Sequence, residues 1–217
     1  MTWTEILGFV TGAASVWLAV RESVWNWPVG IANNVFFLIL FWKAKLYADA
    51  VLQIVYIVIS IFGWWNWLRG GAGHTELPIS RSTARTGILL GVGTVAATAL
   101  FATILRRFTD SAAPLGDSVT TALSLTAQYM LSRKLLENWW VWMTADVIYI
   151  ALYCYKSLFL TSVLYLVFLA MCIAGYDRWK KSVAREREIL HRRCLLCDPR
   201  IGDWKILSTA SRASISH

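Results

Sequence analysis

The chain has 217 residues, of which 57% are hydrophobic and 16% charged, and its mean hydropathy is +0.52. This composition argues against a soluble globular protein and predicts a polytopic membrane protein with little room for a separate soluble domain. The net charge is +8. We attribute it to membrane topology and not to nucleic-acid binding, because no nucleic-acid-binding motif accompanies the basic residues.

Apolar stretches follow one another along the chain, and each predicts a helix. The expected helices are residues 4–20, 28–42, 48–68, 86–105, 116–132, 139–155 and 157–177. Some are shorter than the roughly 20 residues that a bilayer crossing needs. The fourth is rich in Gly, Ala and Thr, which allow close helix packing, and it is expected to be a lipid-facing linker.

The distribution of Lys and Arg predicts the orientation of these helices. One side of the membrane collects the basic positions 21, 69, 81, 85, 133 and 134 and every basic residue from Arg178 onward. The other side has only Lys43, Lys45, Arg106, Arg107 and Lys156. Because basic loops stay in the cytoplasm, we expect an N-terminus outside the cell and a cytoplasmic basic tail.

The chain contains an internal repeat. Residues 21–67 reappear as residues 133–179 at a fixed offset of 112 positions, with matching Asn-Trp pairs (Asn26, Asn138) and matching Gly…Trp pairs. An even number of crossings separates the two units, which predicts an all-α fold of seven transmembrane helices in a 3+1+3 parallel-repeat, SWEET-like arrangement. The expected divisions are 1–70 (first three-helix repeat), 71–111 (loop and linker helix), 112–180 (second repeat) and 181–217 (basic tail).

Polar side chains inside the predicted spans indicate where a substrate would bind, because each is costly in lipid, about 2.5–3.5 kcal/mol for Asp at a helix centre. Residues 49, 53 and 56 share one helical stripe, and residues 146, 149 and 153 share another. Single polar residues of this kind also serve to link helices. The candidate substrate-binding residues are Trp17, Asn34, Asp49, Gln53, Tyr56, Gln128, Tyr129, Asn138, Trp139, Trp142, Asp146, Tyr149 and Tyr153.

Thirteen tryptophans provide aromatic surface of two kinds. Those at helix ends, Trp64, Trp65, Trp67 and Trp179, are expected in the interfacial belt of the membrane. Trp17, Trp139, Trp142 and Tyr129 are better placed for a cage, since aromatic faces attract delocalised cations.

The residues that are missing narrow the chemistry. All three histidines lie outside the predicted spans, and Lys156 alone is a possible intramembrane cation, which disfavours a phosphorylated substrate. Two Asp residues inside the spans suggest passive carriage instead of a proton relay. No catalytic or nucleotide-binding motif indicates an enzyme or a cofactor. His191, Cys194 and Cys197 suggest a metal site at first sight, but a second ligand pair is absent, so we expect free thiols, no metal and no disulfide.

Longer motifs in both repeats carry a family resemblance. They are Trp-Asn-Trp-Pro-Val-Gly at 25–30, Leu-Tyr-Ala-Asp-Ala-Val-Leu-Gln at 46–53, Gly-Trp-Trp-Asn-Trp at 63–67, Ala-Gln-Tyr-Met-Leu-Ser-Arg-Lys at 127–134, Glu-Asn-Trp-Trp-Val-Trp at 137–142 and Gly-Tyr-Asp-Arg-Trp at 175–179. Over residues 1 to about 180, the chain resembles the Pnu family of bacterial vitamin transporters, and most closely its nicotinamide riboside branch.

The resemblance implies a homotrimer in the bacterial inner membrane that transports unphosphorylated vitamins by facilitated diffusion. It also implies a functional link to a cytosolic riboside kinase, which traps the product. Nicotinamide riboside suits the candidate residues. Its polar groups would meet Gln53, Gln128, Asn34 and Asp146, and its ring would be enclosed by Trp17, Trp139, Trp142, Tyr149 and Tyr153.

Other functions remain open. Thiamine is also a flat aromatic cation and is the main alternative within the family, whereas riboflavin is larger and neutral. A membrane-embedded binding subunit that needs partners would fail to transport when reconstituted alone. A membrane enzyme would turn over its substrate when purified.

Overall fold

The computed structural model describes residues 3–43, 45, 47–108, 113–157 and 159–197. They form seven α-helices: α1 (Trp3–Val20), α2 (Asn26–Lys43), α3 (Tyr47–Arg69), α4 (Ala84–Phe108), α5 (Pro114–Ser132), α6 (Asn138–Tyr155) and α7 (Phe159–Cys197). The short 3-10 turn η1 (Ala72–His74) lies between α3 and α4. The prediction of an all-helical chain with these seven segments is confirmed.

The last helix is longer than its apolar stretch. It continues to Cys197, well beyond the end expected at residue 177. Residues 176–197 contain neither Gly nor Pro and are rich in Arg, Glu, Lys and Leu, which favour helix. The described residues up to Lys180 form one compact unit, and those from Lys181 to Cys197 belong to another. The side chains of His191, Cys194 and Cys197, for which we expected free thiols and no metal, lie outside the described part of the structure.

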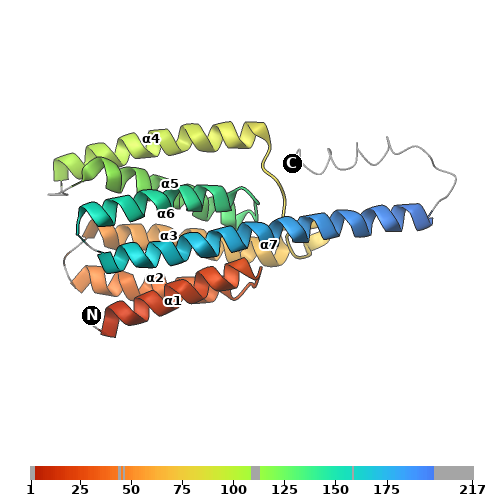
Figure 1. The fold of residues 1–217 in the computed structure, drawn as a ribbon, viewed down its shortest axis with the longest axis horizontal. Helices are drawn as coiled ribbons and strands as arrows, with labels where there is room; N and C mark the ends of the chain where they lie inside the picture. The colour runs from red at the N-terminus through yellow and green to blue at the C-terminus, as the bar shows by residue number, and fades with distance from the viewer. Residues whose placement is uncertain (1–2, 44, 46, 109–112, 158, 198–217) are drawn as a thin grey trace. The chain divides into compact units, whose positions relative to one another are not determined.

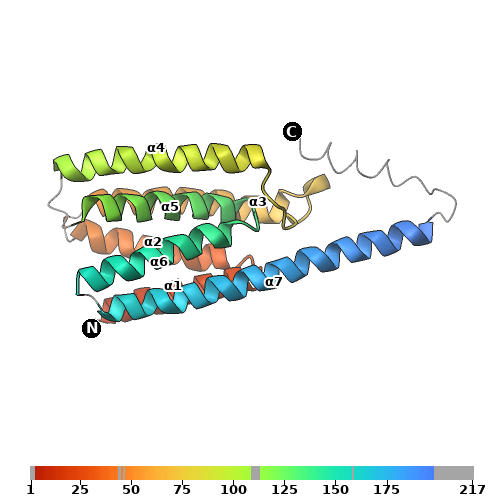
Figure 2. The same cartoon turned by 45° about the horizontal axis from the view of Figure 1, so that its top comes forward.

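The helices of the first unit lie side by side (Figures 1 and 2). Along the chain α1 packs on α2, α2 on α3, α4 on α5 and α5 on α6, while α3 and α5 bring the two sequence repeats together. Helix α4 lies at the edge of the bundle in both views and is almost entirely exposed. Helix α5 is internal, with small side chains such as Ser118, Ala122 and Ser124 buried along it.

Among the described residues, three segments are long and apolar enough to cross a membrane, namely Asp49–Arg69, Ala84–Phe108 and Thr161–Ile189. Leu7–Val20 is apolar but shorter. Helices α2, α5 and α6 have 18 or 19 residues each. These helices are shorter than the roughly 20 residues of a bilayer crossing and carry polar residues such as Asn33, Gln128 and Asp146, so they stand out less by length and composition.

The helix-ending turns repeat at the same offset as the sequence. Glu22 after α1 and Lys134 after α5 have left-handed backbone, with φ of 60° and 53°. In both turns this residue donates its N–H to the carbonyl three positions earlier, and the next residue donates to the carbonyl five positions earlier. This is the Schellman ending, in which Gly is the usual residue. Lys45 and Ser157, also 112 positions apart, have φ of 60° and 59° after α2 and α6.

Four tryptophans form the centre of one end of the bundle, which we call the tryptophan end. Trp27, Trp67, Trp139 and Trp179 are each at most 2% exposed. The ring centroids of Trp27 and Trp67 are 5.4 Å apart and nearly perpendicular, and Trp139 and Trp179 repeat this arrangement at 5.4 Å. Trp67 and Trp179 join the two pairs at 5.9 Å. Such edge-to-face packing is favourable for aromatic rings.

The same cluster ties the repeats together by reciprocal hydrogen bonds. Trp67 Nε1 donates to the Leu131 carbonyl at 2.9 Å, and Trp179 Nε1 donates to the Ala19 carbonyl at 3.1 Å. The expectation that Trp67 and Trp179 belong to an interfacial belt is therefore wrong. Their position at helix ends suggested a belt, but each indole N–H is satisfied inside the protein by the other repeat. Trp64 and Trp65 are exposed, as a belt requires.

Candidate functional site

Three tyrosines from α6 and α7 form a stack, which we call the tyrosine stack. Tyr149 and Tyr153 are one helical turn apart on α6, and Tyr165 of α7 faces both of them. The centroids of Tyr149 and Tyr165 are 4.5 Å apart with an angle of 29° between the rings, and those of Tyr153 and Tyr165 are 5.3 Å apart at 24°. Phe168 packs edge-on against Tyr165 at 5.7 Å. Nearly parallel rings at this spacing offer a surface on which another flat ring can stack.

Hydroxyl groups of α5 lie beside this stack. Ser124 Oγ and Tyr149 OH are 3.4 Å apart and share a hydrogen bond. Tyr56 of α3 also interacts with Ser124 and Tyr149, and Thr120 interacts with Tyr149. Residues of α3, α5, α6 and α7 therefore meet at one place, where polar groups of the first repeat reach the second.

Two further hydrogen bonds join polar side chains of neighbouring helices, one between α6 and α7 and one between α3 and α5. The Cys172 thiol of α7 donates to Asp146 Oδ2 of α6 at 3.4 Å. Gln128 Nε2 of α5 donates to Ser60 Oγ of α3 at 3.3 Å. Ser60 and Cys172 occupy equivalent positions in the two repeats. Each polar group expected to meet a substrate here already has a partner that a ligand would have to replace or share.

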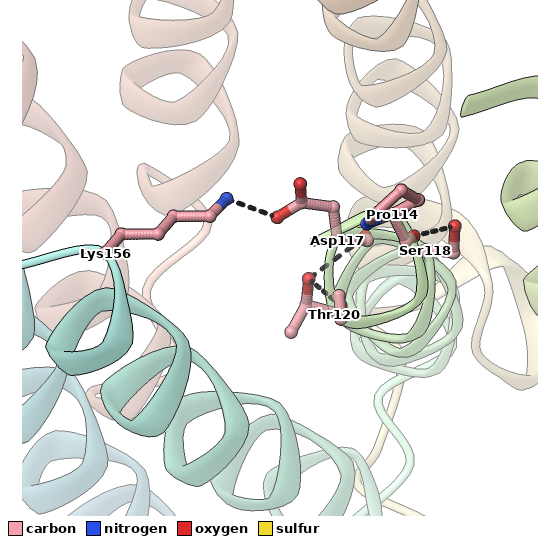
Figure 3. Close-up of polar contacts among 6 residues, drawn as sticks. Pro114, Asp117, Ser118, Thr120 and Lys156 are labelled. Carbon is pink, nitrogen blue, oxygen red and sulfur yellow. Dashed lines mark hydrogen bonds and ion pairs between the residues drawn. The ribbon is translucent and has the colours of Figure 1, made fainter. Parts of the chain in front are cut away.

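An ion pair lies where α5 begins and α6 ends. Lys156 Nζ is 2.8 Å from Asp117 Oδ1, and the two side chains are 24% and 28% exposed. Figure 3 shows the lysine extending from the end of α6 toward the first turn of α5. A carboxylate suits a helix start and an ammonium a helix end. The sequence left Lys156 as the one candidate for a cation inside the membrane, and the structure pairs it with a carboxylate.

In the first turns of α5, around Asp117, side-chain hydroxyls donate hydrogen bonds to backbone carbonyls of the same helix (Figure 3). Thr120 Oγ1 donates to the carbonyls of Gly116 and Asp117 at 3.0 and 3.1 Å, and Ser118 Oγ donates to the Pro114 carbonyl at 2.6 Å. Inside an apolar bundle such bonds satisfy hydroxyl donors that would otherwise be costly to bury.

The structure brings some predicted site residues together. Tyr56 and Tyr149 meet at Ser124, and Tyr153 stacks on Tyr149. Asp146 and Gln128 have side-chain partners in adjacent helices. Asn34, Gln53 and Trp142 are half-buried on α2, α3 and α6.

Other predicted residues lie elsewhere. Trp17 is 47% exposed and is covered by the Arg21 guanidinium at 3.9 Å, and Tyr129 is 40% exposed. Asp49 is exposed in the first turn of α3. Trp139 belongs to the tryptophan end.

Asn138 begins α6 as a structural residue: its Nδ2 donates to the Leu135 carbonyl at 2.6 Å. Asn26 makes the equivalent bond to Ser23 at 3.0 Å. The identity of the Asn-Trp pair in both repeats therefore has a structural explanation in the folding of the turn.

Sequence reasoning missed Tyr165, Ser124 and Cys172. The signal for Tyr165 was present, because it stands where the first repeat has Gln53. Ser124 and Cys172 carry no such signal, since a serine or a cysteine in an apolar helix is compatible with any packing role.

Helices able to span a bilayer, with polar and aromatic side chains gathered between them, are those of a multi-pass membrane transporter. The sequence profile of the nicotinamide mononucleotide transporter family matches residues 2–181, and the chain belongs to this family.

Individual relatives agree with this assignment. The chain is 26% identical over 212 residues to the nicotinamide riboside transporter PnuC of Escherichia coli (strain K12), a match that covers 86% of this chain and 88% of the relative. It is also 26% identical over 197 residues to the riboflavin/roseoflavin transporter RibM of Streptomyces davaonensis, covering 87% and 90%. A crystal structure of the vitamin B3 transporter PnuC superposes with a TM-score of 0.65 at 25% identity, covering 84% of this chain and 83% of that one.

The resemblance inferred from the sequence motifs is thereby confirmed. The motifs of both repeats, from residue 25 to residue 179, lie within the matched range 2–181.

Proposed function

We propose that this protein mediates facilitated diffusion of nicotinamide riboside across the bacterial inner membrane, with phosphorylation by a cytosolic riboside kinase trapping the product. In this proposal the two three-helix units, joined by α4, alternate access to a site between them. The N-terminus lies outside the cell, the basic tail lies in the cytoplasm, and the protein works as a homotrimer.

The observation that carries the proposal is the tyrosine stack with hydroxyl groups beside it. Nicotinamide riboside combines a flat pyridinium cation with a carboxamide and ribose hydroxyls. Aromatic faces attract such a cation by about 0.5–2 kcal/mol. Tyr149, Ser124 and Tyr56 supply hydroxyls within reach of the same surface.

The contacts made by Lys134 and Lys156 favour the riboside as substrate over the mononucleotide that appears in the family's name. Phosphate groups are bound by Arg, Lys or helix N-termini. Lys156 is paired with Asp117. Lys134 is 7% exposed and donates to the Leu77 carbonyl at 2.9 Å. A phosphorylated substrate would have to break one of these contacts to bind Lys134 or Lys156.

Riboflavin is a second candidate, because RibM resembles this chain as closely as the Escherichia coli protein does. Its flat ring could also stack on tyrosines. It is neutral, however, so it would gain no cation–π attraction.

The test is uptake of labelled nicotinamide riboside into liposomes that contain this protein alone, without an ion gradient. The proposal predicts equilibration across the membrane and competition by unlabelled riboside. Nicotinamide mononucleotide should not compete. Block by riboflavin or thiamine but not by the riboside would assign another vitamin, and absence of any uptake would point to a partner-dependent subunit.

A further inference from the structure

The loop between α3 and α4 covers the turn between α5 and α6. Ser80 lies alongside Leu135 in a parallel bridge. The Ser80 N–H donates to the Lys134 carbonyl at 3.1 Å, and the Leu136 N–H donates to the Ser80 carbonyl at 2.9 Å. Backbone of the first half of the chain thus pairs directly with backbone of the second repeat.

Side chains strengthen this pairing. The Ser82 N–H donates to Glu137 Oε2 at 2.8 Å. Lys134 Nζ donates to the Leu77 carbonyl at 2.9 Å and lies 4.7 Å from the centroid of a Trp67 ring. The ammonium is therefore held between a carbonyl of the loop and an aromatic face of α3, an arrangement that stabilises a buried cation.

The loop and the turn are also anchored to the end of α3. The Leu77 N–H donates to the Trp67 carbonyl at 3.0 Å. Asn66 Nδ2 donates to the Ser132 carbonyl at 2.8 Å. The end of α3, residues 77–82 and the α5–α6 turn consequently form one hydrogen-bonded unit, which we call the lock.

The equivalent turn in the first repeat, between α1 and α2, lacks this cover. Glu22 stands where Lys134 does, with the opposite charge, and Trp25 stands where Glu137 does and is 69% exposed. Among the described residues, the hydrogen bonds made by residues 21–25 stay within α1, α2 and the turn itself. The link from α7 is the bond from Trp179 Nε1 to the Ala19 carbonyl, one residue before α1 ends.

We infer that the lock holds the α5–α6 turn on α3, so that the tryptophan end opens by movement of the α1–α2 turn away from α7. The inference rests on the proposed transport function only in requiring that this end of the bundle opens. Four hydrogen bonds join residues 77–82 to residues 134–137. On the other side, within the part of the chain that the structure describes, separation of Ala19 from Trp179 breaks one hydrogen bond, that of the Trp179 indole.

Repeat-equivalent spin-label pairs test the inference. In a variant with Cys154, Cys172, Cys194 and Cys197 replaced by serine, one pair of cysteines is placed at Leu68 and Arg133, across the lock. The matched pair, shifted by 112 positions, is placed at Lys180 and Arg21. All four labelled positions are exposed, so the labels should be tolerated equally.

Pulsed electron spin resonance in lipid nanodiscs then gives the distance distribution of each pair, with and without nicotinamide riboside. The 68/133 pair should show one narrow distance in both conditions. The 180/21 pair should show a broader distribution or two distances. Equal widths for the two pairs, or a broader 68/133 pair, would overturn the inference.

A pair of variants distinguishes the lock from mere local rigidity. Glu137→Ala removes the acceptor for the Ser82 N–H and should broaden the 68/133 distribution. Glu137→Gln keeps an acceptor oxygen and should leave the distribution narrow. An unchanged distribution in Glu137→Ala would count against the lock. Because the two pairs are already compared in the measurements made without riboside, a failure of riboside uptake would refute the proposed substrate while leaving this comparison intact.

Discussion

The two repeats resemble each other more closely at the tryptophan end than around the tyrosine stack. At the tryptophan end the Trp27–Trp67 and Trp139–Trp179 ring pairs are equivalent at an offset of 112 positions, and the indole bonds to Leu131 and Ala19 are reciprocal.

Around the tyrosine stack the backbone equivalence persists but the side chains diverge. Phe37 and Phe41 stack at 5.7 Å where Tyr149 and Tyr153 stack at 5.8 Å, and Gln53 replaces Tyr165. The duplicated positions are thus alike in the tryptophan pairs and differ in the region that we propose as the ligand site.

The largest effect on stability should come from adding a side chain at the two glycines that lie against the tryptophan rings, Gly63 and Gly175. A Cβ on Gly63 would overlap the Trp27 ring, and one on Gly175 would overlap the Trp139 ring. Gly63→Leu and Gly175→Leu should each lower the free energy of unfolding by about 3 kcal/mol or more, because a packed core cannot absorb the added volume. Thermal unfolding in detergent measures this.

Gly91→Leu on α4 is the matched control, since its Cβ would meet nothing within 4 Å. Equal stability of the three variants would show that the cluster is not tightly packed.

A smaller loss of stability is expected at one of the two left-handed turn residues, Lys134, and not at the other, Glu22. Lys134→Gly removes the charged bond to the Leu77 carbonyl, which should cost about 2 kcal/mol of unfolding free energy. Glu22→Gly should be neutral or stabilising by up to about 1 kcal/mol, because glycine adopts positive φ without a steric penalty. Unfolding temperatures of the two variants give the comparison, and an equal loss in both would contradict the asymmetry between the turns.

Making the second repeat resemble the first tests the tyrosine stack as a ligand surface. The double change Tyr149→Phe and Tyr153→Phe keeps the rings and removes the hydroxyls, as at Phe37 and Phe41. Loss of a neutral hydrogen bond costs about 0.5–1.5 kcal/mol. Riboside uptake should therefore fall by about 2- to 10-fold, and loss of the Tyr149–Ser124 bond should lower the free energy of unfolding by no more than the same amount. Tyr155→Phe, at a residue 76% exposed, should leave uptake unchanged. If the double variant took up riboside as fast as the unchanged protein, the two hydroxyls would not contribute to substrate binding.

The smallest effect is expected at the ion pair. The partly exposed Asp117–Lys156 pair has no counterpart in the first repeat, where Ala44 stands in place of Lys156. Asp117→Asn should lower the free energy of unfolding by less than about 1 kcal/mol. A loss above that value, measured by thermal unfolding at low and high salt, would show that the pair contributes more than a surface contact.

The sequence predicted the helices well because apolar stretches and turns alternate along the chain. It also predicted the family, through motifs that occur in both repeats. It misplaced Trp67 and Trp179, since a tryptophan at a helix end has the same local pattern whether it faces lipid or a second tryptophan.

The site was predicted in part. The stripe of Tyr149 and Tyr153 follows from helical spacing, but Tyr165 joins it only through the packing of α7 on α6. Trp17 and Tyr129 were expected in the cage from their place in the sequence, and only the fold shows that both are exposed.

The most direct test of the account is an experimental structure of the protein with nicotinamide riboside bound in a lipid environment. The account predicts the pyridinium ring in stacking contact with Tyr149, Tyr153 or Tyr165, and the ribose hydroxyls or carboxamide near Ser124. A riboside bound away from α6 and α7, for instance at Trp17 or at Tyr129, would contradict it.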